Sequence, residues 1–468
     1  MTNSRVSSLI TLISIFFFWG FVAASNSILT PLFKGIFHFT QFRAQLVEWA
    51  FYISYFVGSS VYFLLSYFVG DPLGKIGYKK GLIIGLLISS VGAIGFIPAA
   101  DSNSYPLLLT CLFTIGLGFA LQQIVANPYV IALGDPSTGS HRLNLAGGVN
   151  SFGTTIGPVL LSLALFGQIS GTTAHADINA VKMPSIILCC MFLLSALVLS
   201  LSKLPPITMH EHTEKSLGAL KYPQLTLGML AIFFYVGVEV TTASNLGKLL
   251  QMPEIKGIDT DKISPYVSLF WGSLMIGRWR GSLTIFNFTK MWKNIMNVVV
   301  PFAAFGVICG VNYLRHSDIS EYVYYIPFIV LAIIIFFIGR DKPARTLILF
   351  SCVAACMMII GLCTTGTLAL FCFISGGLFC SVMWPCIFTL ALTGLGKYTT
   401  QGSSLLVMMI LGGALIPLLQ GRIVDAYNAH ISYCVPIFCF AYLAFYGWKV
   451  RSVLHIQGIN ADTVGTEI

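Results

Sequence analysis

Two glutamates stand inside long apolar stretches and are the first residues that could do chemistry. Glu239 lies within FFYVGVEVTTASNL, and Glu48 lies near the start of the stretch containing EWAFYISYFVGS. A carboxyl group is costly to bury among apolar side chains, and one that is kept there usually binds a cation, exchanges a proton or holds a substrate. Structural roles stay open, since Glu239 could hydrogen-bond a neighbouring helix and Glu48 could reach the headgroups. We predict that Glu239, alone or with Glu48, supplies the carboxylate that binds or exchanges a coupling cation, H⁺ or Na⁺.

Neutral amides fall at the same depth as these acids. An amide both donates and accepts hydrogen bonds, as the hydroxyl groups of a sugar require. The alternative is that the amides join helices to one another. Tryptophan rings could pack against the C–H face of a sugar, or could be packing residues and interface anchors. Because several amides gather in a few stretches, we predict a polar substrate site formed by Asn26, Gln123, Asn127, Asn150, Glu239, Asn245 and Trp384.

Two prolines lie beside these candidate residues. Pro128 follows Asn127, and Pro385 follows Trp384. A proline has no backbone N–H, so it frees a carbonyl one turn earlier and bends its helix. Prolines are common in membrane helices, so each is a weak signal alone.

The pattern does not favour an enzyme or a metal protein. All eight histidines fall in loops or at the edges of apolar stretches. The twelve cysteines form no CxxC pair, and we interpret them as small packing residues rather than disulfides or metal ligands. An intramembrane enzyme would need a nucleophile with its base, or a metal cluster. We therefore predict no catalytic site, no metal and no cofactor beyond a coupling ion.

The elements that position these residues are membrane helices. The chain is 56% hydrophobic and 9% charged, whereas soluble domains carry about 25% charged residues. Stretches of about twenty apolar residues match the roughly 30 Å thickness of the hydrocarbon core. The first stretch is too long for a cleavable signal, so we expect it to be retained. We predict an all-α membrane protein with fourteen spans, at about 8–30, 44–69, 79–99, 105–134, 143–167, 183–202, 223–250, 263–286, 293–312, 321–339, 345–363, 367–393, 400–421 and 430–450.

An even number of spans places both termini on one side of the membrane. If that side is the cytoplasm, most of the 26 lysines and arginines lie in inner loops, as the positive-inside rule requires. The net charge of +9 is spread without a basic run, so no nucleic-acid partner is expected. The long polar interval 203–222 predicts a cytoplasmic linker. It would join an N-terminal half (1–202) to a C-terminal half (223–450), which is followed by a cytoplasmic tail (451–468).

Two glycine-rich basic turns suggest an internal repeat. Gly70, Lys75, Gly77 and Lys79 lie in GDPLGKIGYKK, and Gly277 and Arg278 lie in GRWRG. Glycine permits a tight reversal and close helix approach, while the cations hold a loop in the cytoplasm. Two such turns, each after the second span of its half, are typical of a duplicated transporter. We predict a gating role for these residues.

Several segments stand out as a set, among them FFFWGFVAASNSILTPLFK, LQQIVANPYVIALG, HRLNLAGGVNSFGTTIGP, YVGVEV, MIGRWRGS and MWPCIFTLALTGLG. Together they resemble the fucose–proton symporter and glucose/galactose porter family of the major facilitator superfamily. The resemblance implies uptake of neutral sugars across the inner membrane by alternating access, with two six-helix halves around a central site.

Three departures from this family matter. The first-span pair that is usually Asn-Asp is Asn26-Ser27, so an acid tied to coupling is missing. Gln123 replaces the glutamate of the fucose symporter, whereas Asn150 retains the family's asparagine. The region at about 293–343 adds two spans, which we expect to pack outside the bundle and away from the sugar path. With the first-span acid absent, Glu239 is the leading candidate for coupling.

These observations predict a multi-pass transporter of the bacterial inner membrane. Its substrate would be a neutral monosaccharide, namely a hexose, fucose or an amino sugar, taken up by cation-coupled symport. A multidrug-type exporter and an uncoupled sugar facilitator are the alternatives. The expected partners are the sugar and the lipid bilayer, and the expected state is a monomer.

Overall fold

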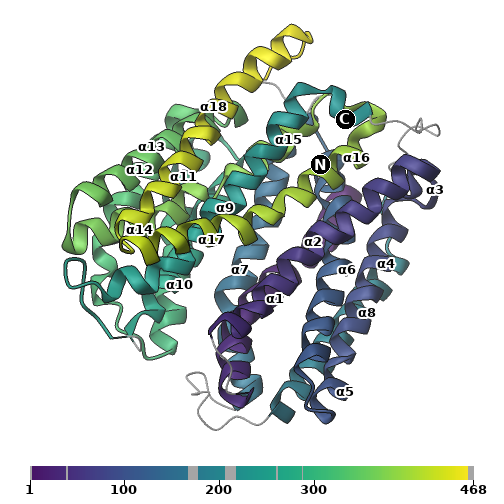
Figure 1. Ribbon diagram of the computed structural model, residues 1–468. Coiled ribbons are helices and arrows are strands. Elements are labelled where there is room, and N and C mark those ends of the chain that lie inside the picture. Colours follow the sequence, from purple (N-terminus) through teal and green to yellow (C-terminus); the bar gives the residue numbers. More distant parts are fainter. Residues whose placement is uncertain are drawn as a thin grey trace.

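The computed structural model describes residues 3–37, 41–166, 178–205, 218–259, 262–286 and 288–461, and within these ranges the regular elements are all helices. The helices form an elongated bundle. The purple and blue helices near the N-terminus lie largely on one side, and the green and yellow helices lie largely on the other (Figure 1). The prediction of an all-α membrane protein is confirmed.

The first group of helices falls within residues 1–202, the range predicted for the N-terminal half. Its members are α1 (Asn3–Phe37), α2 (Gln41–Val69), α3 (Pro72–Ile76), α4 (Tyr78–Ile94), α5 (Phe96–Asp101), α6 (Tyr105–Ala132), α7 (Gly139–Phe166) and α8 (Lys182–Leu201). The short α3 lies in the connection between α2 and α4, and α5 continues the direction of α4 as part of one apolar segment.

The second group begins after the predicted linker. It contains α9 (Pro223–Gln251), α10 (Ser264–Gly281), α11 (Lys290–Leu314), α12 (Ile326–Gly339), α13 (Pro343–Cys363), α14 (Gly366–Cys380), α15 (Met383–Leu392), α16 (Thr399–Met408), α17 (Gly412–Ala426) and α18 (Cys434–Ile456). Helices α14 and α15 are two parts of one apolar segment, and so are α16 and α17.

The two groups share one packing pattern. In the first, α1 packs on α7, α2 and α4 pack on α6, and α4 packs on α8. In the second, α9 packs on α17, α10 and α13 pack on α14, and α13 packs on α18. The patterns correspond element by element when α11 and α12 are left out. Such a recurrence is expected of two related halves, with α11 and α12 as an addition.

Twelve helices in the described ranges are long and apolar enough to cross a membrane. Neither α1 nor α10 is among the twelve: α1 is counted as apolar only over Ser8–Ala24, and α10 carries Arg278 and Arg280. This count does not support the predicted fourteen spans. It also does not show on which side of the membrane the termini lie.

Helices α11 and α12 lie at the edge of the bundle. Helix α11 packs on α10, and α12 packs on α13. The outward face of α11 exposes large apolar side chains, among them Met291 and Trp292. This placement agrees with the expectation that the inserted helices pack outside. They are joined by a short 3₁₀ segment, Ser320–Tyr325, which reaches the first turn of α10.

Candidate substrate cavity

A cavity of about 560 Å³ lies between the two groups of helices. One wall comes from α1, α2, α6 and α7, and the other comes mainly from α9, α10 and α15. Its volume falls within the range of small-molecule sites. The lining combines amides, one carboxylate and two arginines with aromatic rings. Amides and aromatic rings are groups that can bind a polar, uncharged ring.

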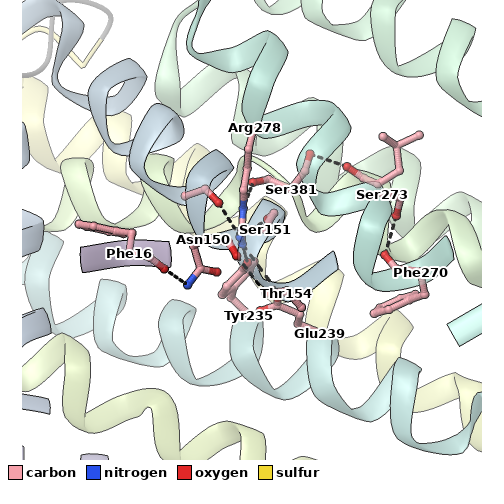
Figure 2. Close-up of polar contacts among 12 residues, drawn as sticks. Phe16, Asn150, Ser151, Thr154, Tyr235, Glu239, Phe270, Ser273, Arg278 and Ser381 are labelled. Atoms are coloured by element: carbon pink, nitrogen blue, oxygen red, sulfur yellow. Dashed lines mark hydrogen bonds and ion pairs between the residues drawn. The ribbon is translucent and has the colours of Figure 1, made fainter. Parts of the chain in front are cut away.

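Arg278 is the last residue of α10 that lines the cavity, and we call this end of the cavity its floor. The side chain joins helices from both groups. Its Nη1 donates to Ser151 Oγ at 2.7 Å and to the Gly147 carbonyl at 3.3 Å, both on α7. Its Nη2 donates to the hydroxyl of Tyr235 on α9 at 3.2 Å. Figure 2 shows the guanidinium between these groups. The side chain is buried, so its charge depends on these partners rather than on water.

Glu239 is the charge partner of Arg278. Its Oε1 lies 3.7 Å from Arg278 Nη2, and the glutamate side chain is 13% exposed and lines the cavity. Tyr235 precedes Glu239 by one turn of α9, so both point at the same guanidinium (Figure 2). Glu239 is therefore an acid paired across helices at a cavity wall, which the sequence alone does not show.

A proline explains why Arg278 can bind α14. The Arg278 Nε donates to the Ser381 carbonyl at 3.1 Å. That carbonyl lies four residues before Pro385, which has no N–H to offer it. The backbone breaks between α14 and α15 at this point, and the arginine takes up the freed acceptor.

The second proline, Pro128 in α6, frees the Ile124 carbonyl in the same way. Ser403 of α16 donates its hydroxyl to this carbonyl at 2.8 Å. The contact joins the two groups of helices next to the cavity. Each proline thus frees a backbone carbonyl that accepts a hydrogen bond from a side chain of another helix.

Three predicted amides are brought together on one wall. Gln123 Nε2 donates to the Tyr55 hydroxyl at 3.2 Å, and Asn127 Nδ2 donates to the Gln123 carbonyl at 3.1 Å. Asn150 Nδ2 donates to the Phe16 carbonyl at 3.1 Å (Figure 2). All three amides line the cavity. The buried Asn127 Oδ1 has no hydrogen-bond partner among the described residues.

Trp384 faces these amides from the other group of helices. It lines the cavity and is packed against Phe388 and Tyr235, with ring centroids 5.5 Å and 6.0 Å away. Trp19 and Trp271 also line the cavity. Trp384 and Trp271 offer flat apolar faces opposite the hydrogen-bonding amides, whereas Trp19 of α1 lies in the same wall as the amides.

The remaining predicted site residues fall elsewhere. Asn245 does not line the cavity; its Nδ2 donates to Gln420 Oε1 of α17 at 2.7 Å. The structure therefore places this predicted substrate residue outside the cavity, where its amide joins two helices. The side chains of Asn26 and Glu48 lie outside the part of the chain that the structure describes.

The first glycine-rich turn lies between α2 and α4, as predicted. Gly70 and Gly77 adopt φ angles of 85° and 83°, which favour glycine. Lys75 Nζ donates to the Val69 carbonyl at 3.1 Å, and Lys79 Nζ donates to two carbonyls at the end of α8 at 2.8 Å. Asp71 caps α3 by accepting from the Leu73 N–H at 3.0 Å.

The second turn needs a correction. Gly277 and Arg278 lie inside α10, and the helix continues to Gly281. Arg278 is therefore a cavity residue rather than a loop cation. A Cβ at Gly277 would lie 1.8 Å from Ser381 Oγ, so this glycine is needed for the close approach of α10 to α14.

Contacts between α7 and α10 close the floor. The Trp279 indole donates to the Gly148 carbonyl at 3.3 Å, and a His141 ring nitrogen lies 2.6 Å from the Gly281 carbonyl. Further along the same end, the hydroxyls of Tyr78 and Thr400 lie 2.8 Å apart. Away from this floor the lining runs along α10 as far as Ser264.

The end of α10 is also held by an acid that follows α12. Arg280 donates to Asp341 at 2.7 Å and lies over the Phe336 ring at 4.1 Å. Lys293 of α11 donates to the same carboxylate at 3.0 Å. Burial raises the pKa of Asp341, but Arg280 and Lys293 outweigh it and hold the pKa well below its ordinary value. Asp341 therefore stays charged and ties the inserted helices to the floor.

One expectation about the inserted helices is wrong. Arg315, which caps the C-terminal end of α11, lines the cavity. The inserted pair therefore reaches the substrate path at one end, because α11 packs along α10 and its last turn comes beside the first turns of that helix.

Tyr55, Tyr235 and Thr154 are further lining residues that the sequence did not single out.

Residues 10–417 match the Major Facilitator Superfamily. The chain belongs to the major facilitator superfamily. Members of this superfamily are transporters, and this chain is a multi-pass membrane transporter rather than an enzyme.

Similar proteins indicate which branch of the superfamily this transporter resembles. The transporter is 33% identical to the glucose/galactose transporter of Brucella abortus over 443 residues, covering 94% of this chain and 93% of the relative. It is 27% identical to the L-fucose-proton symporter of Escherichia coli K12 over 464 residues, covering 94% and 92%. The resemblance found in the sequence is confirmed.

A solved structure shares the architecture. The crystal structure of the major facilitator superfamily transporter FucP in the outward conformation superposes with a TM-score of 0.74 at 27% identity. The match covers 96% of this chain and 99% of that one.

Removing the arginine of the floor should destabilise the transporter. Arg278→Met leaves Glu239 buried without a cation, which we expect to cost about 3 kcal/mol. Adding Glu239→Gln should recover part of that loss, since the orphaned charge is gone. Thermal unfolding of the purified protein measures both, with the exposed Arg422→Gln as a control. Equal unfolding temperatures for Arg278→Met and the native protein would contradict the pairing.

Proposed function

We propose that this protein takes up a monosaccharide, namely a hexose, fucose or an amino sugar, across the bacterial inner membrane by proton-coupled symport. The observation that carries the proposal is the cavity between two groups of helices, closed at one end by the Arg278–Glu239 pair. The names of the relatives support a sugar as substrate and H⁺ rather than Na⁺ as the coupling ion.

The lining suits an uncharged sugar ring. Gln123, Asn127 and Asn150 offer donors and acceptors from α6 and α7, and Trp384 offers a ring face from α15. A sugar between them would hydrogen-bond on one side and pack its C–H face on the other. It would also contact both groups of helices at once, which is how binding can favour one arrangement of the two halves over another.

Glu239 supplies the coupling group. When it is charged, it holds Arg278 from α9 while Ser151 and the Gly147 carbonyl hold the guanidinium from α7. A proton arriving from the open end of the cavity neutralises Glu239 and removes one partner of the arginine. A buried guanidinium without its charge partner is costly, so the closed floor is destabilised relative to an open arrangement in which Arg278 reaches water, and the floor opens with the sugar bound. Loss of the proton to the cytoplasm restores the pair.

We further propose that α1 and α10 also cross the bilayer, which gives fourteen spans with both termini in the cytoplasm. Helix α1 has 35 residues and α10 has 18, and both pack along established spans. In this arrangement residues 1–202 and 223–450 are the two halves, 203–222 joins them, 451–468 is the tail, and one monomer contains a complete path.

The topology is open to a reporter test. Alkaline phosphatase fused to either terminus should be inactive, and green fluorescent protein fused to either terminus should fluoresce, because only cytoplasmic reporters show that pattern. The reverse pattern at one terminus would contradict an even number of spans.

Uphill uptake should depend on Glu239. In proteoliposomes with an inward proton gradient, Glu239→Gln should abolish accumulation of radiolabelled sugar yet keep sugar exchange across the membrane, since the binding amides are intact. Glu254→Gln removes an exposed acid outside the cavity and should accumulate sugar like the native protein.

Accumulation by Glu239→Gln at the native level would refute coupling through this residue. A native protein that equilibrates sugar without accumulating it would be an uncoupled facilitator. A native protein that moves no sugar but expels apolar cations would be a multidrug-type exporter, and the proposed function would be wrong.

A further inference from the structure

The inserted helices carry a cation to the outer part of the cavity. Arg315 lines the cavity together with Ser264, Val267 and Ser268 from the first turns of α10. These residues lie ten or more positions before Arg278, which is about 15 Å along the helix. A monosaccharide bound beside Arg278 would not span that distance. Arg315 therefore belongs to a second position on the path, beyond the central site.

The segment that presents Arg315 is firmly attached. Asn312 Nδ2, one turn earlier on α11, donates to Ser268 Oγ at 2.9 Å. The Tyr322 hydroxyl donates to the Pro265 carbonyl at 2.6 Å. Glu321 accepts from the Tyr266 hydroxyl at 2.6 Å and forms an ion pair with Lys256. The connection between α11 and α12 is thus fixed to the start of α10, and the arginine is held at the cavity edge.

The charge of Arg315 is not balanced by a neighbouring acid. Among the described lining residues the charged side chains are Glu239, Arg278 and Arg315, and the first two form a pair. Arg315 makes no ion pair with a described residue, and Glu321, in the connection after α11, pairs with Lys256. Burial lowers the pKa of Arg315 from its ordinary value, which agrees with a charge that lacks compensation. When Glu239 is protonated, the described charges of the lining are two arginines.

We propose that Arg315 forms an outer subsite that captures the carboxylate of sugar acids, so that the transporter accepts hexuronates in addition to neutral monosaccharides. A guanidinium binds a carboxylate through two parallel hydrogen bonds. A cation in a cavity with low-dielectric walls also raises the local concentration of anions. The inference rests on the proposed sugar transport, and uptake of a proton with a hexuronate would leave the transported charge balanced.

The experiment is a kinetic comparison in proteoliposomes at low salt. Radiolabelled glucuronate and galacturonate are tested against glucose and galactose. In Arg315→Gln, the ratio of the KM for hexuronate to the KM for the neutral sugar should rise about tenfold, with kcat for hexuronate little changed. Arg315→Lys should give an intermediate ratio, because it keeps the charge and loses the two-pronged geometry. Arg422→Gln, an exposed arginine outside the cavity, should leave both substrates as in the native protein.

Two results would overturn the inference while the proposed function stands. In one, the native protein carries neutral sugars but neither transports hexuronates nor is inhibited by them. In the other, it carries hexuronates and the KM ratio is the same in Arg315→Gln. If the native protein carries no sugar of either kind, the proposed function fails and the outer subsite fails with it.

Discussion

A single buried guanidinium joins the two groups of helices beside the cavity. Arg278 takes the Ser381 carbonyl that Pro385 leaves free, and it reaches Ser151 and Gly147 across the interface between the two groups of helices. An unpaired charge is costly in this environment, and the carboxylate of Glu239 offsets that cost. The floor of the cavity, the contact between the halves and the acid proposed for coupling therefore share one residue. A change in the charge of Glu239 is felt directly where the halves meet.

The inserted helices constrain α10, the helix that carries this arginine. At the floor, Asp341 holds Arg280 and Lys293 together. At the other end, Asn312 and the connection after α11 hold the first turns of α10. A motion of α10 must therefore carry α11 and α12 with it. We infer that the inserted helices make α10, α11 and α12 move together as one rigid unit. They also bring Arg315 to the substrate path.

The sequence predicted several polar residues of the cavity lining but not the ion pair among them. Gln123, Asn127, Asn150, Glu239 and Trp384 all line the cavity, because polar side chains deep in apolar helices have few other places to point. Asn245 does not line the cavity. It lies six residues after Glu239 on α9, and a rotation of about 100° per residue places its side chain on a different face of the helix. The ion pair with Arg278 could not be read from the sequence, because its two members come from different helices and the helix end near Arg278 was taken for a loop.

The fold was predictable to a similar extent. Composition and the length of the apolar stretches gave the helical bundle, and the glycine-rich turn after α2 was placed correctly. The contribution of Arg315 to the cavity was missed because periodicity within α11 says nothing about which helix its last turn will meet. Only the contacts of Asn312 and Tyr322 with α10 determine that position.

The most direct test of the account is a distance measurement across the closed floor. Spin labels carried by an unnatural amino acid at Lys80 of α4 and Arg451 of α18, both exposed, report the separation of the two halves at that end and leave the native cysteines in place. The native protein should give one main population at short distance, and Arg278→Met should add a population at longer distance. A distance distribution that is identical in the two proteins would contradict the claim that Arg278 holds the halves together.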